Sequence, residues 1–134
     1  MAKTNASVER FRKLTKDMQR EIHDTAVTEL HIQATELAHM IQSVAPVYEG
    51  KLVTTVKVIP GKTDTQVRVV AGGEKTVRKG VSSKPYDYAR ADEFGTVNMP
   101  AHPFFFPTYR LKKKKMISSM KRKITAQIKK RSAE

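Results

Sequence analysis

The sequence predicts an α+β protein: a long N-terminal helix, a small antiparallel sheet built on a hairpin, and a basic C-terminal helix. Two observations carry this prediction. Near both ends of the chain, apolar residues recur at intervals of three and four, which is the helical period. Between these ends, two short stretches alternate apolar and polar residues around a Pro60-Gly61 turn, which is typical of a hairpin. With 134 residues, the chain is expected to form a single domain over residues 1–134.

The first helix is predicted over residues 8–44. Its apolar positions form one stripe from Phe11 to Ile41, and Pro46 ends it because the residue before a proline avoids the helical conformation. Residues 1–7 are small and polar, and we expect them to fray. A continuous helix of this length would span about 55 Å, which is long for so small a domain. Two alternatives stay open: the helix breaks near residues 25–28, or its N-terminal half projects and packs on another subunit.

The middle of the chain predicts a β-hairpin over residues 51–71, followed by a basic loop. The strands are expected at residues 51–59 and 66–71, on either side of a turn at residues 60–64. A third strand or a helix must cover them, because two strands alone are marginally stable. Residues 72–85 are rich in glycine and cations, which indicates a mobile basic loop, and loops of this length tend to be functional or disordered. Its cationic residues are Lys75, Arg78, Lys79 and Lys84.

Residues 86–107 concentrate aromatic, proline and acidic residues. The pattern does not decide between strand and helix for residues 86–94, and three prolines keep residues 99–106 extended. Two interpretations of the three consecutive phenylalanines stay open: all three lie in the core, or at least one leaves it as an interface anchor on a stiff segment. The candidate interface residues are Tyr86, Tyr88, Glu93, Phe94, Phe104, Phe105 and Phe106.

The C-terminal helix is predicted over residues 108–131, with Pro107 at its start. From Arg110 to Arg131 it carries many cations and no acid. Three interpretations stay open: a solvated cationic face, contact with nucleic-acid phosphates, or contact with an acidic partner. The net charge of +13 favours an anionic partner, whether nucleic acid, acidic protein or anionic lipid. The candidate contact residues on this helix are Lys112, Lys113, Lys114, Lys115, Lys121, Arg122 and Lys123.

No pattern in the sequence predicts an enzyme. Asp87, Asp92 and Glu93 could form a carboxylate pair, but acid–base catalysis also needs a companion base and a pocket, and the sequence indicates neither. We expect these acids to pair with arginines or to cap a turn. The glycines do not have the spacing of a phosphate-binding loop.

Cofactors, metals and membrane spans are not expected either. The chain has no cysteine, which excludes disulfides and thiolate ligands. His23, His31 and His39 lie eight residues apart, so they drift round the predicted helix and cannot share a metal ion. No apolar segment approaches the ~20 residues of a membrane-spanning helix, and the N-terminal residues do not resemble a signal peptide.

Four short motifs, in order, resemble a known family. They are Ala45-Pro46-Val47-Tyr48-Glu49-Gly50-Lys51-Leu52, Tyr88-Ala89, Glu93-Phe94-Gly95-Thr96, and Pro100-Ala101-His102-Pro103-Phe104 with Pro107 opening the last helix. Their order and spacing, over residues 7–130, are similar to those of the tail-completion or head–tail joining proteins of siphophages, the lambdoid "gene-ten-product-like" putative tail components.

The resemblance implies a non-enzymatic structural protein of a virion neck, assembled in the host cytoplasm. Such a protein would form a ring, expected to be a hexamer, around the DNA channel. Its partners would be tail terminator or tail tube proteins and head connector or adaptor proteins, with DNA passing through the lumen. The alternative function is that of a small basic protein that binds nucleic acid without sequence preference.

Overall fold

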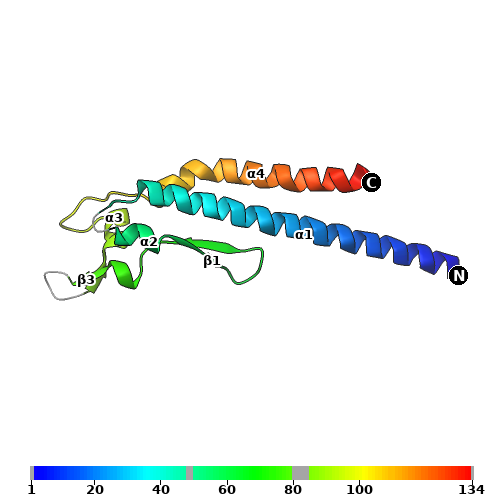
Figure 1. The fold of residues 1–134 in the computed structure, drawn as a ribbon, viewed down its shortest axis with the longest axis horizontal. Coiled ribbons are helices and arrows are strands. Elements are labelled where there is room, and N and C mark those ends of the chain that lie inside the picture. Colours follow the sequence, from blue (N-terminus) through cyan, green and yellow to red (C-terminus); the bar gives the residue numbers. More distant parts are fainter. Residues whose placement is uncertain (1, 48–49, 80–84, 134) are drawn as a thin grey trace.

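The computed structural model describes residues 2–47, 50–79 and 85–133, and it has the expected α+β architecture. In chain order its elements are α1 (Ala2–Val44), α2 (Lys51–Thr55), β1 (Lys57–Pro60), β2 (Val67–Val70), the 3₁₀ turn η1 (Glu74–Thr76), β3 (Val77–Lys79), β4 (Pro85–Asp87), α3 (Tyr88–Phe94) and α4 (Phe106–Ala133). The two long helices, α1 and α4, lie side by side and run in opposite directions (Figure 1). The short elements lie along the C-terminal half of α1, and the hairpin of β1 and β2 reaches toward its middle (Figure 1).

Helix α1 is continuous over 43 residues, so it does not break at residues 25–28. Its length is about 65 Å at 1.5 Å per residue. The expectation that residues 1–7 fray is wrong for the described residues 2–7, which belong to the helix. These residues include no glycine or proline, and residues such as Ala2 and Ala6 favour the helical conformation.

The predicted strand over residues 51–59 is wrong in its first half, because Lys51–Thr55 forms the short helix α2. Gly50, with a φ of +78°, turns the chain into this helix. The hydroxyl groups of Thr54 and Thr55 donate to the carbonyl oxygens three residues earlier, at 2.7 and 2.6 Å, which supports a helical turn despite the β-branched side chains. The hairpin is therefore shorter than expected: β1 pairs antiparallel with β2, with Lys57 opposite Val70.

The predicted basic loop over residues 72–85 contains regular structure, which is a second correction. The turn η1 leads into β3, and β3 pairs antiparallel with β4, with Val77 opposite Asp87. This second sheet has strands of only three residues, which are too short to show an alternating pattern. Residues 80–84, which connect its strands, lie outside the described residues. Helix α3 follows directly, which settles the open assignment of residues 86–94 as a strand and then a helix.

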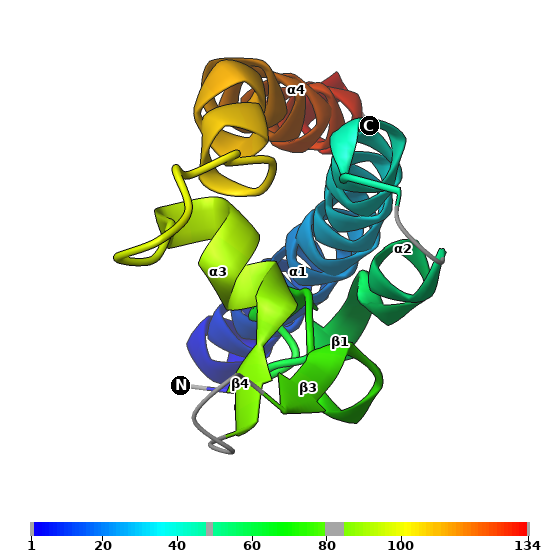
Figure 2. The ribbon, with the colours of Figure 1, turned by 90° about the vertical axis from the view of Figure 1, so that its left-hand side faces the viewer.

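The hydrophobic core lies at one end of the molecule. It is formed by Leu37, Ala38, Ile41, Ala45, Leu52, Val56, Tyr88, Ala89 and Phe104. These residues come from the C-terminal third of α1 and the residue after it, from α2 and the residue after it, from α3, and from the segment that enters α4. These parts converge at this end of the molecule (Figure 2). The opposite end of α1 has no such cover: all side chains from position 5 to position 14 are exposed.

Candidate functional site

Glu93 organises the aromatic segment. Its carboxylate oxygen Oε2 accepts hydrogen bonds from the backbone N–H groups of Phe104 and Phe105, and Oε1 accepts one from Phe106, each at 2.9 Å. Phe106 is the first residue of α4, and the first N–H groups of a helix have no partner within it. Glu93, which is only 8% exposed, supplies a partner for the N–H group of Phe106 and places a negative charge at the helix N-terminus.

The residues that follow Glu93 return the chain to α4. Gly95, with a φ of +76°, ends α3, and its N–H group donates to the carbonyl oxygen of Ala91 at 2.7 Å. A Cβ atom at this position would lie 2.9 Å from the backbone nitrogen of Ala101, so the close approach of the segment after α3 requires glycine. The N–H group of His102 then donates to the carbonyl oxygen of Asp92 at 2.6 Å. The Glu-Phe-Gly-Thr and Pro-Ala-His-Pro-Phe motifs are thus one hydrogen-bonded unit.

Asp87 has a similar role at the start of α3. Its Oδ1 accepts hydrogen bonds from the N–H group of Ala89 at 2.9 Å and from the hydroxyl group of Thr76 at 2.6 Å. The first bond caps α3 and the second ties η1 to it. Asp87 and Glu93 therefore accept bonds from structural donors, as expected of turn-capping acids, and Asp92 is buried.

The three consecutive phenylalanines divide between the core and the surface. Phe104 is buried, Phe105 is partly buried and Phe106 is 45% exposed. Both open interpretations therefore hold in part: one ring fills the core and one leaves it. Phe94 is 65% exposed, and its ring centroid lies 6.0 Å from that of Phe106.

Three of the seven candidate interface residues are not on the surface of the monomer. Tyr88, Glu93 and Phe104 are buried, so within one subunit they belong to the interior rather than to an exposed surface. The guanidinium carbon of Arg78 lies 4.6 Å from the centroid of the Tyr88 ring, a cation–π contact. Tyr86 remains exposed on β4.

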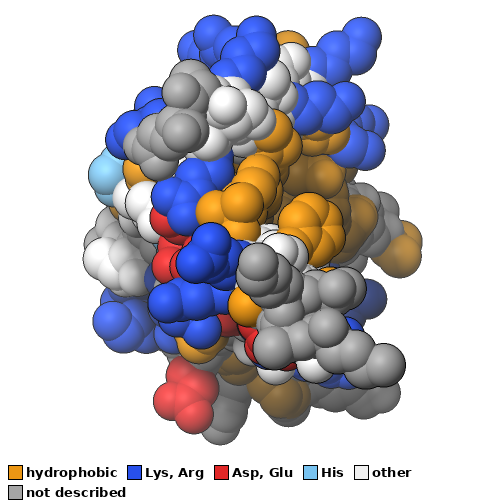
Figure 3. Space-filling view, turned by 90° about the vertical axis from the view of Figure 1, so that its right-hand side faces the viewer, with side chains coloured by type: hydrophobic (Ala, Val, Ile, Leu, Met, Phe, Trp, Pro, Cys, Tyr) orange, Lys and Arg blue, Asp and Glu red, His pale blue; other side chains and the backbone are white. Residues whose placement is uncertain are grey.

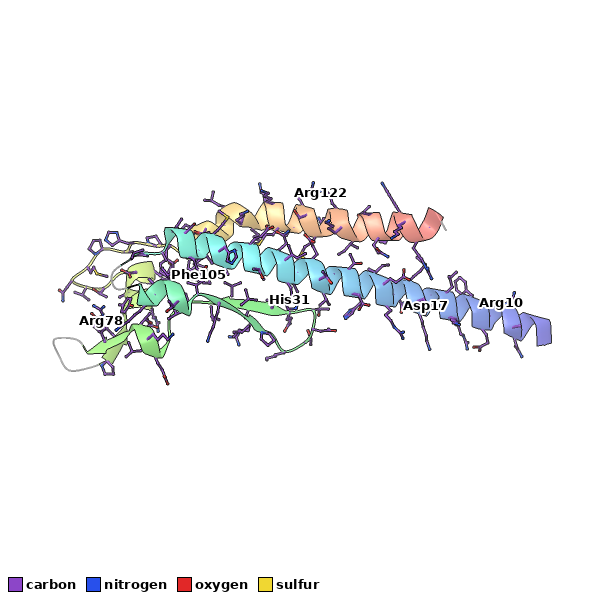
Figure 4. All side chains as sticks on the ribbon, in the orientation of Figure 1. Arg10, Asp17, His31, Arg78, Phe105 and Arg122 are labelled. Atoms are coloured by element: carbon purple, nitrogen blue, oxygen red, sulfur yellow. The ribbon has the colours of Figure 1, made fainter. Side chains whose placement is uncertain are left out.

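An apolar cavity of about 330 Å³ opens beside the exposed aromatic rings. It lies between the end of β2, helix α3 and the entry to α4, and Phe105, one of its lining residues, is labelled in Figure 4. Its apolar lining comes from Val70, Ala71, Ala89, Phe94, Phe104, Phe105 and Phe106. The sequence does not predict this cavity, because its walls come from segments up to 36 residues apart.

The candidate cations of α4 are exposed with one exception. Lys113, Lys114, Lys115, Lys121, Arg122 and Lys123 are exposed. Lys112 is half-buried. Arg122 points away from α1 (Figure 4). Most of the predicted cations of α4 are therefore accessible, and because they include consecutive residues they lie on more than one side of the helix.

The cations of residues 72–85 lie elsewhere. Lys75 in η1 and Arg78 in β3 are exposed, Lys79 is the last residue of β3, and Lys84 lies outside the described residues. Strand β3 and helix α4 are on opposite sides of the molecule in both ribbon views (Figures 1 and 2). Within one subunit, the fold does not bring the two predicted cationic groups together.

Sequence patterns do not predict three long-range contacts that hold the β1–β2 hairpin and α4 to α1. The ring nitrogen Nε2 of His23 lies 2.7 Å from Oδ2 of Asp64 in the hairpin turn. Near the C-terminal end of α4, Gln127 donates a hydrogen bond to Glu21 at 3.4 Å, and Arg131 pairs with Glu21 at 3.5 Å. None of these pairs has a local sequence signal, because the partners are at least 41 residues apart.

Comparison of the chain with protein-family models, with curated proteins and with solved structures finds no match. Within the described part of the chain, no three His, Asp or Glu side chains gather closely enough to hold a metal ion. Over the same residues, no helix is both long and apolar enough to cross a membrane.

Proposed function

We propose that this chain is a non-enzymatic structural protein of a tailed-phage neck, which joins the completed tail to the head connector as a ring around the DNA channel. The observation that carries the proposal is the arrangement of the motifs on which the family resemblance rests. Glu93-Phe94-Gly95-Thr96 and the segment that enters α4 are held together by the three bonds to Glu93. The unit presents Phe94 and Phe106 at one end of the molecule.

Three features support an assembly role. Exposed aromatic residues on a rigid support make good interface anchors, because little conformational entropy is lost on docking. Helix α1 also extends well beyond the body of the domain, which supports the alternative that its N-terminal part packs on another subunit. The basic surface of α4 offers contacts to an acidic neighbour or to DNA in the lumen.

The test is electron microscopy of phage lysates in which this gene alone is inactivated, with the wild-type gene supplied in trans as the control. We expect DNA-filled heads beside separate tails of full length, and joined particles in the complemented lysate. Normal joined particles without the gene would refute the neck assignment.

The exposed lysines of α4 favour one other function, non-specific binding of nucleic acid. The test is the binding of duplex DNA by purified protein across a series of salt concentrations. If Lys113, Lys114 and Lys115 each contact a phosphate, changing all three to Glu should reduce the slope of log K against log salt by about 3. The matched control changes Lys57, Lys62 and Arg68 of the exposed hairpin surface to Glu, with the same change in net charge.

The same two triple variants, compared with the wild type, separate the two functions. A neck protein should bind free duplex DNA only weakly when purified. In phage, its α4 variant should lose infectivity while it still folds. Tight binding that weakens steeply with salt would favour the nucleic-acid function instead. Wild-type infectivity of the α4 variant would exclude an essential role for this surface.

A further inference from the structure

The N-terminal part of α1 presents apolar side chains that are largely exposed among the described residues. Phe11 is 70% exposed and Leu14 is 51% exposed, and Val8 shares the same side of the helix, three residues away. The contact between Arg131 and Glu21 marks the end of α4, and Arg10 lies beyond it (Figure 4). Seen from this end, hydrophobic side chains gather between Lys and Arg side chains (Figure 3).

The complementary feature lies at the other end of the molecule. It is the apolar cavity of about 330 Å³ beside Phe94 and Phe106. An apolar cavity of ~150 Å³ already accommodates a benzene molecule. The cavity beside Phe94 therefore has room for a phenyl ring and part of a second apolar side chain, such as that of a leucine.

The subunit cannot fill this cavity with its own projecting helix. Thirty residues of uninterrupted helix separate Phe11 from Ile41, which packs in the same core as Phe104, and this corresponds to about 45 Å. Only a second copy can bring the two features together. We propose that Phe11, with Leu14 beside it, inserts into the apolar cavity beside Phe94 and Phe106 of a second copy of this chain.

The charges around the two features favour the same pairing. Arg10, Arg12 and Lys13 flank Phe11, and with Glu9, which pairs with Arg12 at 3.6 Å, they give this part of the helix a net charge of +2. The cavity wall includes the carboxylates of Asp87 and Glu93. The cavity also contains one cation, Arg90, so its ionisable lining residues sum to a single negative charge. Two projecting helices packed on each other would instead bring cations against cations, which disfavours a symmetric pair of projections.

Each copy carries one projecting side chain and one cavity, at opposite ends. The contact is therefore heterologous, and repeated contacts close into a ring or continue as an open chain. The inference rests on the proposed function only for the closure into a ring. It names the partner surfaces within that ring, and the contact can be tested in isolation.

The test uses two complementary variants of the full chain and analytical ultracentrifugation over a range of concentrations. Phe11→Glu removes the projecting ring, and Phe94→Lys disrupts the mouth of the cavity and repels the cations beside Phe11. We expect the wild-type protein to self-associate and each variant to do so at least about 30-fold more weakly, as for an interface hot spot. A 1:1 mixture of the two variants should form a heterodimer, because the Phe94→Lys chain keeps its Phe11 ring and the Phe11→Glu chain keeps its cavity.

Two controls keep the test interpretable. Ile32→Glu changes an exposed residue of α1 away from both features and should associate like the wild type. Circular dichroism should show unchanged folding, since both altered rings are more than half exposed. A wild type that stays monomeric, or a mixture that forms no heterodimer, would overturn the inference. So would self-association that is lost in Phe11→Glu but retained in Phe94→Lys, which indicates pairing of two projections.

The outcomes also separate this inference from the neck assignment. Separated heads and tails without the gene, together with a failed mixing experiment, would leave the neck function and remove the contact. Heterodimer formation by the purified variants, together with normal particles in the absence of the gene, would support the contact and refute the neck function.

Discussion

Replacing Glu93 should destabilise the protein more than its single charge suggests. Its carboxylate satisfies three backbone N–H groups at the entry to α4, each at 2.9 Å. Each donor left without a partner costs about 1–3 kcal/mol when buried. The N–H group of Phe104 is buried, whereas those of Phe105 and Phe106 can partly recover water. We therefore expect Glu93→Ala to lower the free energy of unfolding by about 3–4 kcal/mol.

Glu93→Gln should be a milder change. The amide keeps one carbonyl oxygen, which can still accept the bonds from Phe104 and Phe105. Its NH₂ group would face the N–H group of Phe106, so one bond is lost and two donors oppose each other. The expected cost is about 1–2 kcal/mol. The order wild type, Gln, Ala in stability is a specific consequence of this geometry.

The assay is urea unfolding followed by circular dichroism, at a protein concentration low enough to limit self-association. With a urea m-value of about 2 kcal/mol/M, Glu93→Ala should lower the midpoint by about 1.5–2 M. Glu36→Ala, at an exposed position of α1, is the control. Hydrogen exchange should also become faster at the amides of Phe104 to Phe106. Equal midpoints for the Glu93 and Glu36 variants, with unchanged exchange, would refute the capping role.

Three further substitutions test other contacts that hold the fold together. Gly72→Ala should cost about 2–4 kcal/mol, because Gly72 has a φ of +90° and a Cβ would lie 2.7 Å from Oδ2 of Asp87; a wild-type thermal midpoint would contradict this. Thr76→Val keeps the shape of a fully buried side chain but removes the 2.6 Å bond to Asp87, so calorimetry should show a loss of about 1–3 kcal/mol. Glu21→Gln weakens the half-exposed pair with Arg131 and should change urea stability by less than about 1 kcal/mol; a larger loss would mean that this pair anchors α4.

The second of the two open alternatives for the first helix is the one that the structure supports within a single chain: the helix does not break and its N-terminal part projects. The β-branched cluster at residues 25–28 did not interrupt it, because helix propensities differ by fractions of a kcal/mol and packing against α4 outweighs them. By contrast, the same weak preferences misled the prediction at Lys51–Thr55. There, burial of Leu52 and the back-bonding threonines favour a helical turn over a strand.

The sequence by itself determined the class of the fold, the two long helices, the hairpin and the cationic character of α4. These features depend on periodicity, turn residues and composition, which are local properties of the chain. Only the tertiary structure decided the roles of individual residues in the aromatic segment. Whether Glu93 caps a helix, Phe104 enters the core or Phe94 borders a cavity depends on which distant backbone groups meet there. That meeting is set by the packing of α3 against the entry to α4, and no local pattern encodes it.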